Sequence, residues 1–314
     1  MPRASGGDIL PGTSAVLVVS HGTVDDLDDL AAFATQVRRG SPPSPELVAE
    51  LRRRYVAIGG SPLNAINARV AEKLERRLGV PVAWANRLWR PYARDVLAAL
   101  GREGKTRVAL VPLAQHSAHV YAEDARPAAL EAGITLACAA NWGRSSKLCG
   151  AFAERIARVV APADAGSTVV VMTAHSLPKA IVDRGDPYAH EVAHAADAIA
   201  ARLREHIGPS LRHAVAYQSQ GLATNGPGGR PVEWLGPDLP TTLDRVQAGG
   251  AARVVLAPIG FLADHVEILY DLDVDARRLA EERGLTYARA PSLNADDDLI
   301  DVLADVARPL LADA

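Results

Sequence analysis

The stretch TVVVMTAHSLP, residues 168–178, defines one half of the fold, because a run of β-branched residues leads directly to a histidine. Residues 168–173 are apolar without alternation, which is the pattern of a parallel strand covered on both faces. Comparable runs occupy residues 15–20, 80–86, 107–113, 135–141, 213–218, 253–259 and 286–290. Helical segments lie between them, such as residues 44–58, 63–78, 91–101 and 190–206. The pattern predicts an α/β protein with two Rossmann-like doubly wound domains, each built on a four-stranded parallel sheet.

The boundary between the two halves is expected near residues 142–147, ahead of a helix over residues 148–160. This divides the chain into an N-terminal half, residues 1–146, and a C-terminal half, residues 147–314. A last helix, within residues 297–314, can pack back on the first half.

The composition excludes several classes of protein. The 314 residues are 48% hydrophobic and 23% charged with a net charge of −3, so we expect no nucleic-acid partner and no polybasic membrane patch. No run approaches the about 18 apolar residues of a membrane span, and the first dozen residues carry no apolar signal core. The expectation is a cytoplasmic protein with, at most, weak peripheral membrane contact. Two cysteines, Cys138 and Cys149, are too few for a four-thiolate iron–sulfur cluster.

Chemically versatile side chains follow the predicted strands, where open α/β sheets bind their ligands. His21 follows the first strand and His175 the fifth, while the seventh leads into Asp264, His265 and Glu267. Histidine at a rigid strand end can ligate a divalent metal ion or accept a proton near neutral pH. The alternative for His175 is a structural residue that caps the next loop. His265 is open to two interpretations, an orienting partner of Glu267 or an ordinary partly buried residue.

Three carboxylates recur at a helical spacing. Glu267, Asp271 and Asp275 lie at i, i+4 and i+8 in a predicted helix over residues 266–283, and so share one face. Like charges at this spacing destabilise a helix by a few tenths of a kcal/mol per pair. One interpretation is a relay for protons or cations. The other is a solvated acidic face near a helix N-terminus.

Arginines cluster after the first strand, at positions 38, 39, 52, 53 and 54. The planar guanidinium pairs with carboxylates in bidentate fashion, so the cluster would suit a substrate with several carboxylate groups. Solvation of a helix surface is the alternative. No glycine-rich phosphate loop or dinucleotide fingerprint accompanies these residues.

Several of these segments together resemble the ferrochelatases. The motif around the family's catalytic histidine is similar to TAHSLPKAIVDRGDPY at residues 173–188, and its glutamate-bearing segment to PIGFLADHVEILYDLD at residues 258–273. YQS at 217–219 and WLGPDL at 234–239 also match. Upstream, RRG at residues 38–40 and RRRYVAIGGSPL at residues 52–63 resemble the family's substrate-cleft segments.

The resemblance implies insertion of ferrous iron into a porphyrin, either protoporphyrin IX or coproporphyrin III, in haem synthesis. It implies His175 and Glu267 as catalytic and metal-contacting residues, and Asp271 and Asp275 as an ion and proton relay. The implied substrate contacts are Arg38, Arg54, Tyr55 and Ser61. His21, at the end of the first predicted strand, is a further predicted substrate contact, either as an additional metal ligand or as an axial neighbour of the product. Iron is then a substrate, no cofactor is needed, and the partners are the porphyrin and iron, bound by a monomer.

The sequence departs from the family pattern at His21-Gly22-Thr23, where many ferrochelatases carry tyrosine in place of His21. The histidine is more similar to the sirohydrochlorin chelatase group, so a chelatase for another tetrapyrrole and metal is one alternative. A non-catalytic tetrapyrrole carrier is a second, and a two-lobed metal-binding protein a third. A short polar segment after Gly40, SPPSPE, favours coproporphyrin III over protoporphyrin IX.

Overall fold

The computed structural model describes residues 12–220 and 232–312. The prediction that the first dozen residues carry no signal core therefore falls almost wholly outside the described residues. The chain forms two compact units, each assembled from separate stretches. The first unit comprises Met1–Val24, Leu63–Trp142 and Asn294–Ala314. The second unit comprises Asp25–Pro62 and Gly143–Leu293.

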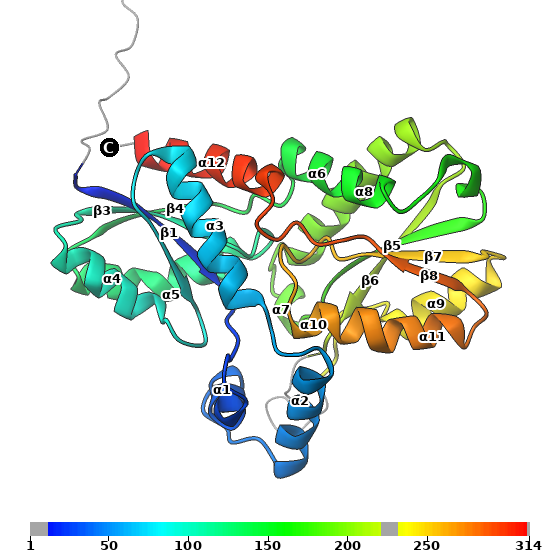
Figure 1. Cartoon of the computed structure of the whole chain (residues 1–314), viewed down its shortest axis with the longest axis horizontal. Helices are drawn as coiled ribbons and strands as arrows, with labels where there is room; N and C mark the ends of the chain where they lie inside the picture. The colour runs from blue at the N-terminus through cyan, green and yellow to red at the C-terminus, as the bar shows by residue number, and fades with distance from the viewer. Residues whose placement is uncertain (1–11, 221–231, 313–314) are drawn as a thin grey trace, which may run out of the picture. The chain divides into compact units, whose positions relative to one another are not determined.

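The first unit is built on a parallel sheet in the order β2-β1-β3-β4. Its strands are β1 (Ser14–Ser20), β2 (Val82–Asn86), β3 (Arg107–Pro112) and β4 (Thr135–Cys138). Helices α3 (Leu63–Leu78) and α12 (Asp297–Ala312) cover one face, and α4 (Ala93–Arg102) and α5 (Ala118–Glu131) the other (Figure 1). The C-terminal helix therefore packs on α3 and β3.

The second unit repeats this topology, with a parallel sheet in the order β6-β5-β7-β8. Its strands are β5 (Thr168–His175), β6 (Arg212–Gln218), β7 (Arg253–Ala257) and β8 (Thr286–Arg289). Helices α6 (Ser146–Ala157) and α8 (Tyr188–His206) pack together on one face, and α9 (Leu239–Ala248) and α11 (Arg277–Glu281) on the other (Figure 1). The prediction of two four-stranded, doubly wound halves is confirmed.

Shorter elements complete the second unit. They are the 3-10 turns η1 (Leu27–Asp29) and η2 (Pro162–Asp164) and the helices α1 (Leu30–Val37), α2 (Pro45–Ala57) and α7 (Lys179–Val182). The Ser44 hydroxyl caps α2 by accepting a hydrogen bond from the Leu47 amide at 3.3 Å. Helices α1 and α2 contact each other as a hairpin.

Each sheet has its own apolar core. All seven residues of β1 are buried, as are the first seven of β5, which explains why these strands read as continuous apolar runs. Leu17, Leu97 and Leu110 lie in the core of the first unit, and Leu243 and Leu256 in that of the second.

The strand order places a topological switch point between β5 and β7, because the chain leaves β5 toward β6 on one side and returns to β7 on the other. Open α/β sheets bind ligands outside the carboxyl ends of the strands at such points. We therefore expect a ligand site at the residues that follow β5 and β7.

The helix predicted over residues 266–283 is not one α-helix. It consists of α10 (Val266–Leu269), a π-helical segment over Asp271–Ala276, and α11. The Asp275 amide donates to the Tyr270 carbonyl at 3.1 Å, which is the i to i+5 bond of a π-turn. The prediction was wrong because the apolar spacing of this stretch is also compatible with an α-helix.

No helix within residues 12–220 and 232–312 is both long and apolar enough to cross a lipid bilayer.

Candidate active site

His175 is the last residue of β5 and is held in one orientation. Its ring Nδ1 lies 2.6 Å from the Ser176 carbonyl oxygen, and its own carbonyl accepts a hydrogen bond from the Tyr188 hydroxyl at 2.9 Å. A carbonyl oxygen can only accept, so Nδ1 carries the proton. The lone pair of a neutral imidazole is then at Nε2.

The carboxylate of Glu267 lies beside this nitrogen. His175 Nε2 lies 3.7 Å from Glu267 Oε1, and His265 Nε2 lies 3.6 Å from Oε2. His265 is oriented in the same way, since its Nδ1 donates to the Ala263 carbonyl at 3.0 Å. The carboxylate of Glu267 thus lies between two imidazole nitrogens that can each hold a proton or face a cation.

The negative charge of Glu267 raises the pKa of His265. Burial alone would lower the pKa of the imidazole, but the nearby negative charge of Glu267 outweighs this effect. The structure therefore supports the interpretation of His265 as a partner of Glu267.

A glycine brings the two loops together. The Gly260 amide donates to the Thr173 carbonyl at 2.9 Å, and a Cβ at this position would lie 2.6 Å from Cα and Cβ of Ala174. The backbone after β7 therefore lies against the end of β5 with no room for a side chain. This close approach is what sets His175 beside the segment that carries Glu267.

Asp271 lies one turn beyond Glu267 and is nearly enclosed, with 13% of its side chain exposed. One carboxylate oxygen accepts from the Ser219 hydroxyl, and the other lies 3.2 Å from Arg54 Nη1. Burial and the negative charge of Glu267 raise the pKa of Asp271 to about 6. A carboxyl group with this pKa exchanges protons near neutral pH.

Asp275 continues the row in the π-helical segment and is half-buried. Burial would lower the pKa of Arg54, but Glu50 and the negative charges of Asp271 and Asp275 outweigh this effect and raise the pKa. The three carboxylates predicted to form a row therefore follow one another from Glu267 into the neighbourhood of Arg54.

The predicted arginine cluster is already engaged within the second unit. Arg54 Nε donates to Glu50 at 2.7 Å, and Arg53 holds Glu50 through two bonds of 2.8 Å. These hydrogen bonds lower the pKa of Glu50 to about 2. The guanidinium carbons of Arg53 and Arg54 lie 5.1 and 5.2 Å from the centre of the Tyr270 ring.

The other predicted substrate contacts in this unit differ in exposure. Arg38 ends α1, and its Nε donates to the Ser41 carbonyl at 3.2 Å. Tyr55 is only 2% exposed, so its ring belongs to the interior of the unit. The Ser61 hydroxyl is buried and makes no hydrogen bond to the residues that the structure describes.

His21 belongs to the first unit and is exposed at the end of β1. Gly22 follows it with φ of 113°, and a Cβ there would lie 3.1 Å from the side chain of Asn86. Beneath this turn the Ser20 hydroxyl donates to Asn86 Oδ1 at 2.7 Å and accepts from Asn67 Nδ2 at 2.7 Å. This buried network holds the loop that presents His21.

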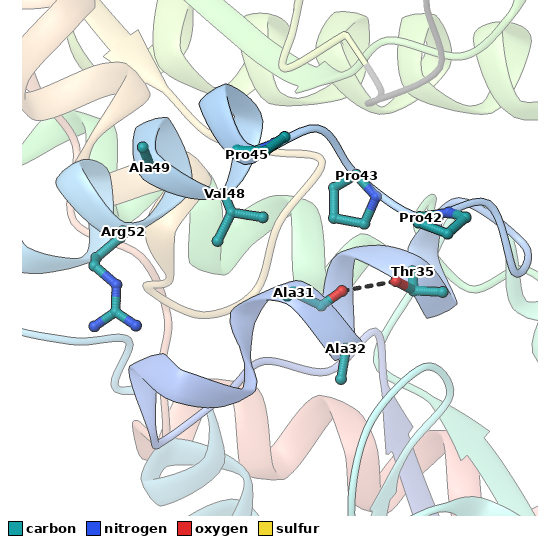
Figure 2. A pocket seen from close by; sticks show the side chains of 9 residues that line it. All are labelled: Ala31, Ala32, Thr35, Pro42, Pro43, Pro45, Val48, Ala49 and Arg52. Carbon is teal, nitrogen blue, oxygen red and sulfur yellow. Dashed lines mark hydrogen bonds between the residues drawn. The ribbon is translucent and has the colours of Figure 1, made fainter.

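Helices α1 and α2 enclose an open hollow of about 630 Å³ (Figure 2). It is lined mainly by small apolar and proline side chains: Ala31, Ala32, Thr35, Pro42, Pro43, Pro45, Val48, Ala49 and Arg52. Arg52 is paired with Asp28 at 2.8 Å. The hollow contains none of the predicted site residues.

Gln218 and Ser219, which belong to the YQS motif, were not among the predicted site residues. Gln218 Nε2 donates to the Glu267 carbonyl at 2.8 Å, and Ser219 bonds Asp271 from a left-handed backbone conformation with φ of 55°. Gln218 ends β6 and Ser219 follows it, so the strand-end rule that selected His175 would have found them. Within the described residues no three His, Cys, Asp or Glu side chains converge as a metal-binding group.

Comparison of solved structures places the fold among the chelatases. SirB from Bacillus subtilis with Fe3+ superposes with a TM-score of 0.59 at 14% identity, covering 96% of both chains. The sirohydrochlorin chelatase SirB from Bacillus subtilis subspecies spizizenii in complex with cobalt gives a TM-score of 0.52 at 15% identity, covering 95% of each. These neighbours define a chelatase-type fold.

Sequence comparison gives the family. The Ferrochelatase family model matches residues 13–310. A ferrochelatase of Acidobacterium capsulatum is 33% identical, covering 94% of both proteins. A coproporphyrin III ferrochelatase of Anoxybacillus flavithermus is 34% identical, covering 93% of this chain and 94% of the relative. The chain belongs to the ferrochelatase family, which confirms the resemblance seen in its motifs.

Proposed function

We propose that the protein inserts ferrous iron into a porphyrin with release of two protons, as a step of haem synthesis. The observation that carries the proposal is the Glu267 carboxylate between His175 Nε2 and His265 Nε2, at 3.7 and 3.6 Å. Metallation must remove two pyrrole protons and bring a desolvated cation to the ring nitrogens. A carboxylate flanked by two oriented imidazoles supplies both kinds of contact.

In this mechanism His175 and Glu267 are the catalytic, metal-contacting pair. The fixed Nδ1 proton of His175 leaves Nε2 to accept a pyrrole proton or to meet the incoming iron. Glu267 neutralises the cation and returns protons toward Asp271, whose pKa of about 6 suits proton exchange. Asp275 extends this relay. A cleft complementary to a bent macrocycle would expose the ring nitrogens and lower the barrier further.

We propose coproporphyrin III as the preferred porphyrin. It carries more carboxylates than protoporphyrin IX, and the chain is rich in arginine around α1 and α2. Arg38 and Arg54 are the proposed carboxylate contacts, and Ser61 and His21 remain predicted porphyrin contacts. The Tyr55 ring is only 2% exposed, so we do not propose it as a carboxylate contact. Arg54 already bridges Glu50 and Asp271, so a substrate carboxylate would have to share its guanidinium.

Iron is a substrate in this proposal and no further cofactor is invoked. Cys138 and Cys149 are free thiols whose pKa values are raised by burial. We propose a monomer that acts in the cytoplasm.

The experiment mixes the purified protein anaerobically with Fe(II) and either coproporphyrin III or protoporphyrin IX, and follows the Soret and Q bands. Multiple turnovers with either porphyrin support iron insertion, and faster turnover of coproporphyrin III supports the substrate assignment. Stoichiometric binding without turnover would instead identify a tetrapyrrole carrier. Turnover confined to Co(II) and sirohydrochlorin would identify the other chelatase activity.

A further inference from the structure

Arg289 is the last residue of β8. It makes ionic contacts with Asp264 and Asp273, on either side of Glu267 in the chain. Its Nε and Nη2 hold both oxygens of Asp273 at 2.7 and 2.9 Å. Its Nη1 lies 3.3 Å from Asp264 Oδ1. Only 13% of the Arg289 side chain is exposed, so these contacts are shielded from water.

The first carboxylate that Arg289 holds is inside the π-helical segment, two residues after Asp271. Tyr287, two residues before Arg289 on β8, donates its hydroxyl to the Leu272 carbonyl at 2.7 Å. Two side chains of one strand therefore fix both a side chain and a carbonyl of this segment. A π-turn is rare, and this one is contacted by two side chains of β8.

The second carboxylate lies on the other side of Glu267. Asp264 precedes Glu267 by three residues, and its Oδ1 also accepts from the Ser292 hydroxyl at 2.7 Å. The Arg289 guanidinium thus links the loop before α10 with the π-helical segment that follows α10. Glu267 and Asp271 lie between these two attachment points.

We propose that Arg289 is a positioning residue for iron insertion, which fixes Glu267 relative to His175 by clamping the chain on both sides of Glu267. The proposal rests on the proposed function. None of the described contacts of Arg289 reaches His175, Glu267 or Asp271, so its effect is exerted through Asp264 and Asp273. Lysine cannot replace it, because an ammonium group lacks the planar fork that binds both oxygens of Asp273 while reaching Asp264.

The test compares Arg289→Lys and Arg289→Met with Arg283→Met. Arg283 also forms a partly buried ion pair in this unit, 2.7 Å from Asp244, but it contacts neither Asp264 nor Asp273. It therefore controls for the loss of a structural arginine. Kinetics are measured as kcat and KM for the porphyrin, and Co(II) binding is followed by visible absorption without porphyrin.

We expect Arg289→Lys to lower kcat and weaken Co(II) binding by about tenfold, with KM for the porphyrin nearly unchanged. Arg283→Met should leave all three values within about twofold of those of the starting protein. Equal losses in the Arg289 and Arg283 variants, or none in a folded Arg289→Lys, would overturn the positioning role. If Arg289→Met does not fold, Arg289→Lys carries the test.

A starting protein that fails to metallate either porphyrin would refute the proposed function. The Co(II) affinities of Arg289→Lys and Arg283→Met would still decide whether Arg289 positions Glu267. The two failures are therefore distinguishable.

Discussion

At the scale of single residues, the protonation of Asp271 should be visible in stability. Its folded pKa of about 6 exceeds the ordinary value of 3.8, so folding is penalised as pH rises through the interval from 3.8 to 6. Asp271→Asn removes this penalty. We expect the variant to gain about 2 kcal/mol relative to the starting protein between pH 4 and pH 7.

Urea unfolding at the two pH values measures this difference. Asp297→Asn is the matched control: the hydrogen bond and positive charge of Lys73 lower the pKa of Asp297 below 3.8, so its titration lies below pH 4 and the effect of the substitution should be nearly the same at the two pH values. An equal effect of Asp271→Asn at pH 4 and pH 7 would show that the carboxyl titrates normally.

His265 provides a second residue-scale prediction. Its Nε2 faces Glu267 at 3.6 Å, and its Nδ1 is fixed by Ala263. His265→Gln keeps a polar side chain but removes the titrating imidazole, so we expect kcat to fall by about 10- to 100-fold. The acidic limb of the pH profile should also shift, measured with saturating porphyrin. Unchanged kcat and pH profile would exclude His265 from the chemistry.

At the scale of elements, the contact between the β5 end and the loop after β7 admits no side chain at position 260. Gly260→Ala forces a Cβ against Ala174, and we expect a loss of about 1–3 kcal/mol in the free energy of unfolding. Gly150→Ala in α6, where a Cβ meets nothing within 4 Å, should instead gain about 0.5–1 kcal/mol. Denaturant melts of both variants measure the pair, and equal effects would contradict the close approach.

Some elements could be predicted from the sequence and others could not. The central strands β1 and β5 were predictable because each is a continuous buried apolar run, and His175 was predictable because it ends β5. The π-helical segment was not, since DLDVDA fits an α-helix as well. The Arg54–Asp271 pair was not predictable either, because it joins residues 217 positions apart and only tertiary packing brings them together.

At the scale of the whole molecule, two units with separate cores should respond separately to a core mutation. Leu303 on α12 is fully buried in the first unit, so Leu303→Ala should cost about 2–5 kcal/mol. Amide hydrogen exchange should then accelerate in β1, β2, β3 and β4 more than in β5, β6, β7 and β8. Equal acceleration in both sheets would show that the units unfold as one.

We propose that iron meets the porphyrin at Glu267, between His175 and His265. The direct measurement is single-turnover Fe(II) insertion into coproporphyrin III by Glu267→Gln, with porphyrin binding measured in parallel. Glutamine keeps the size of the side chain and removes its charge and basicity. We expect porphyrin affinity to be retained and the insertion rate to fall by about 100-fold or more. An insertion rate close to that of the starting protein would contradict the account.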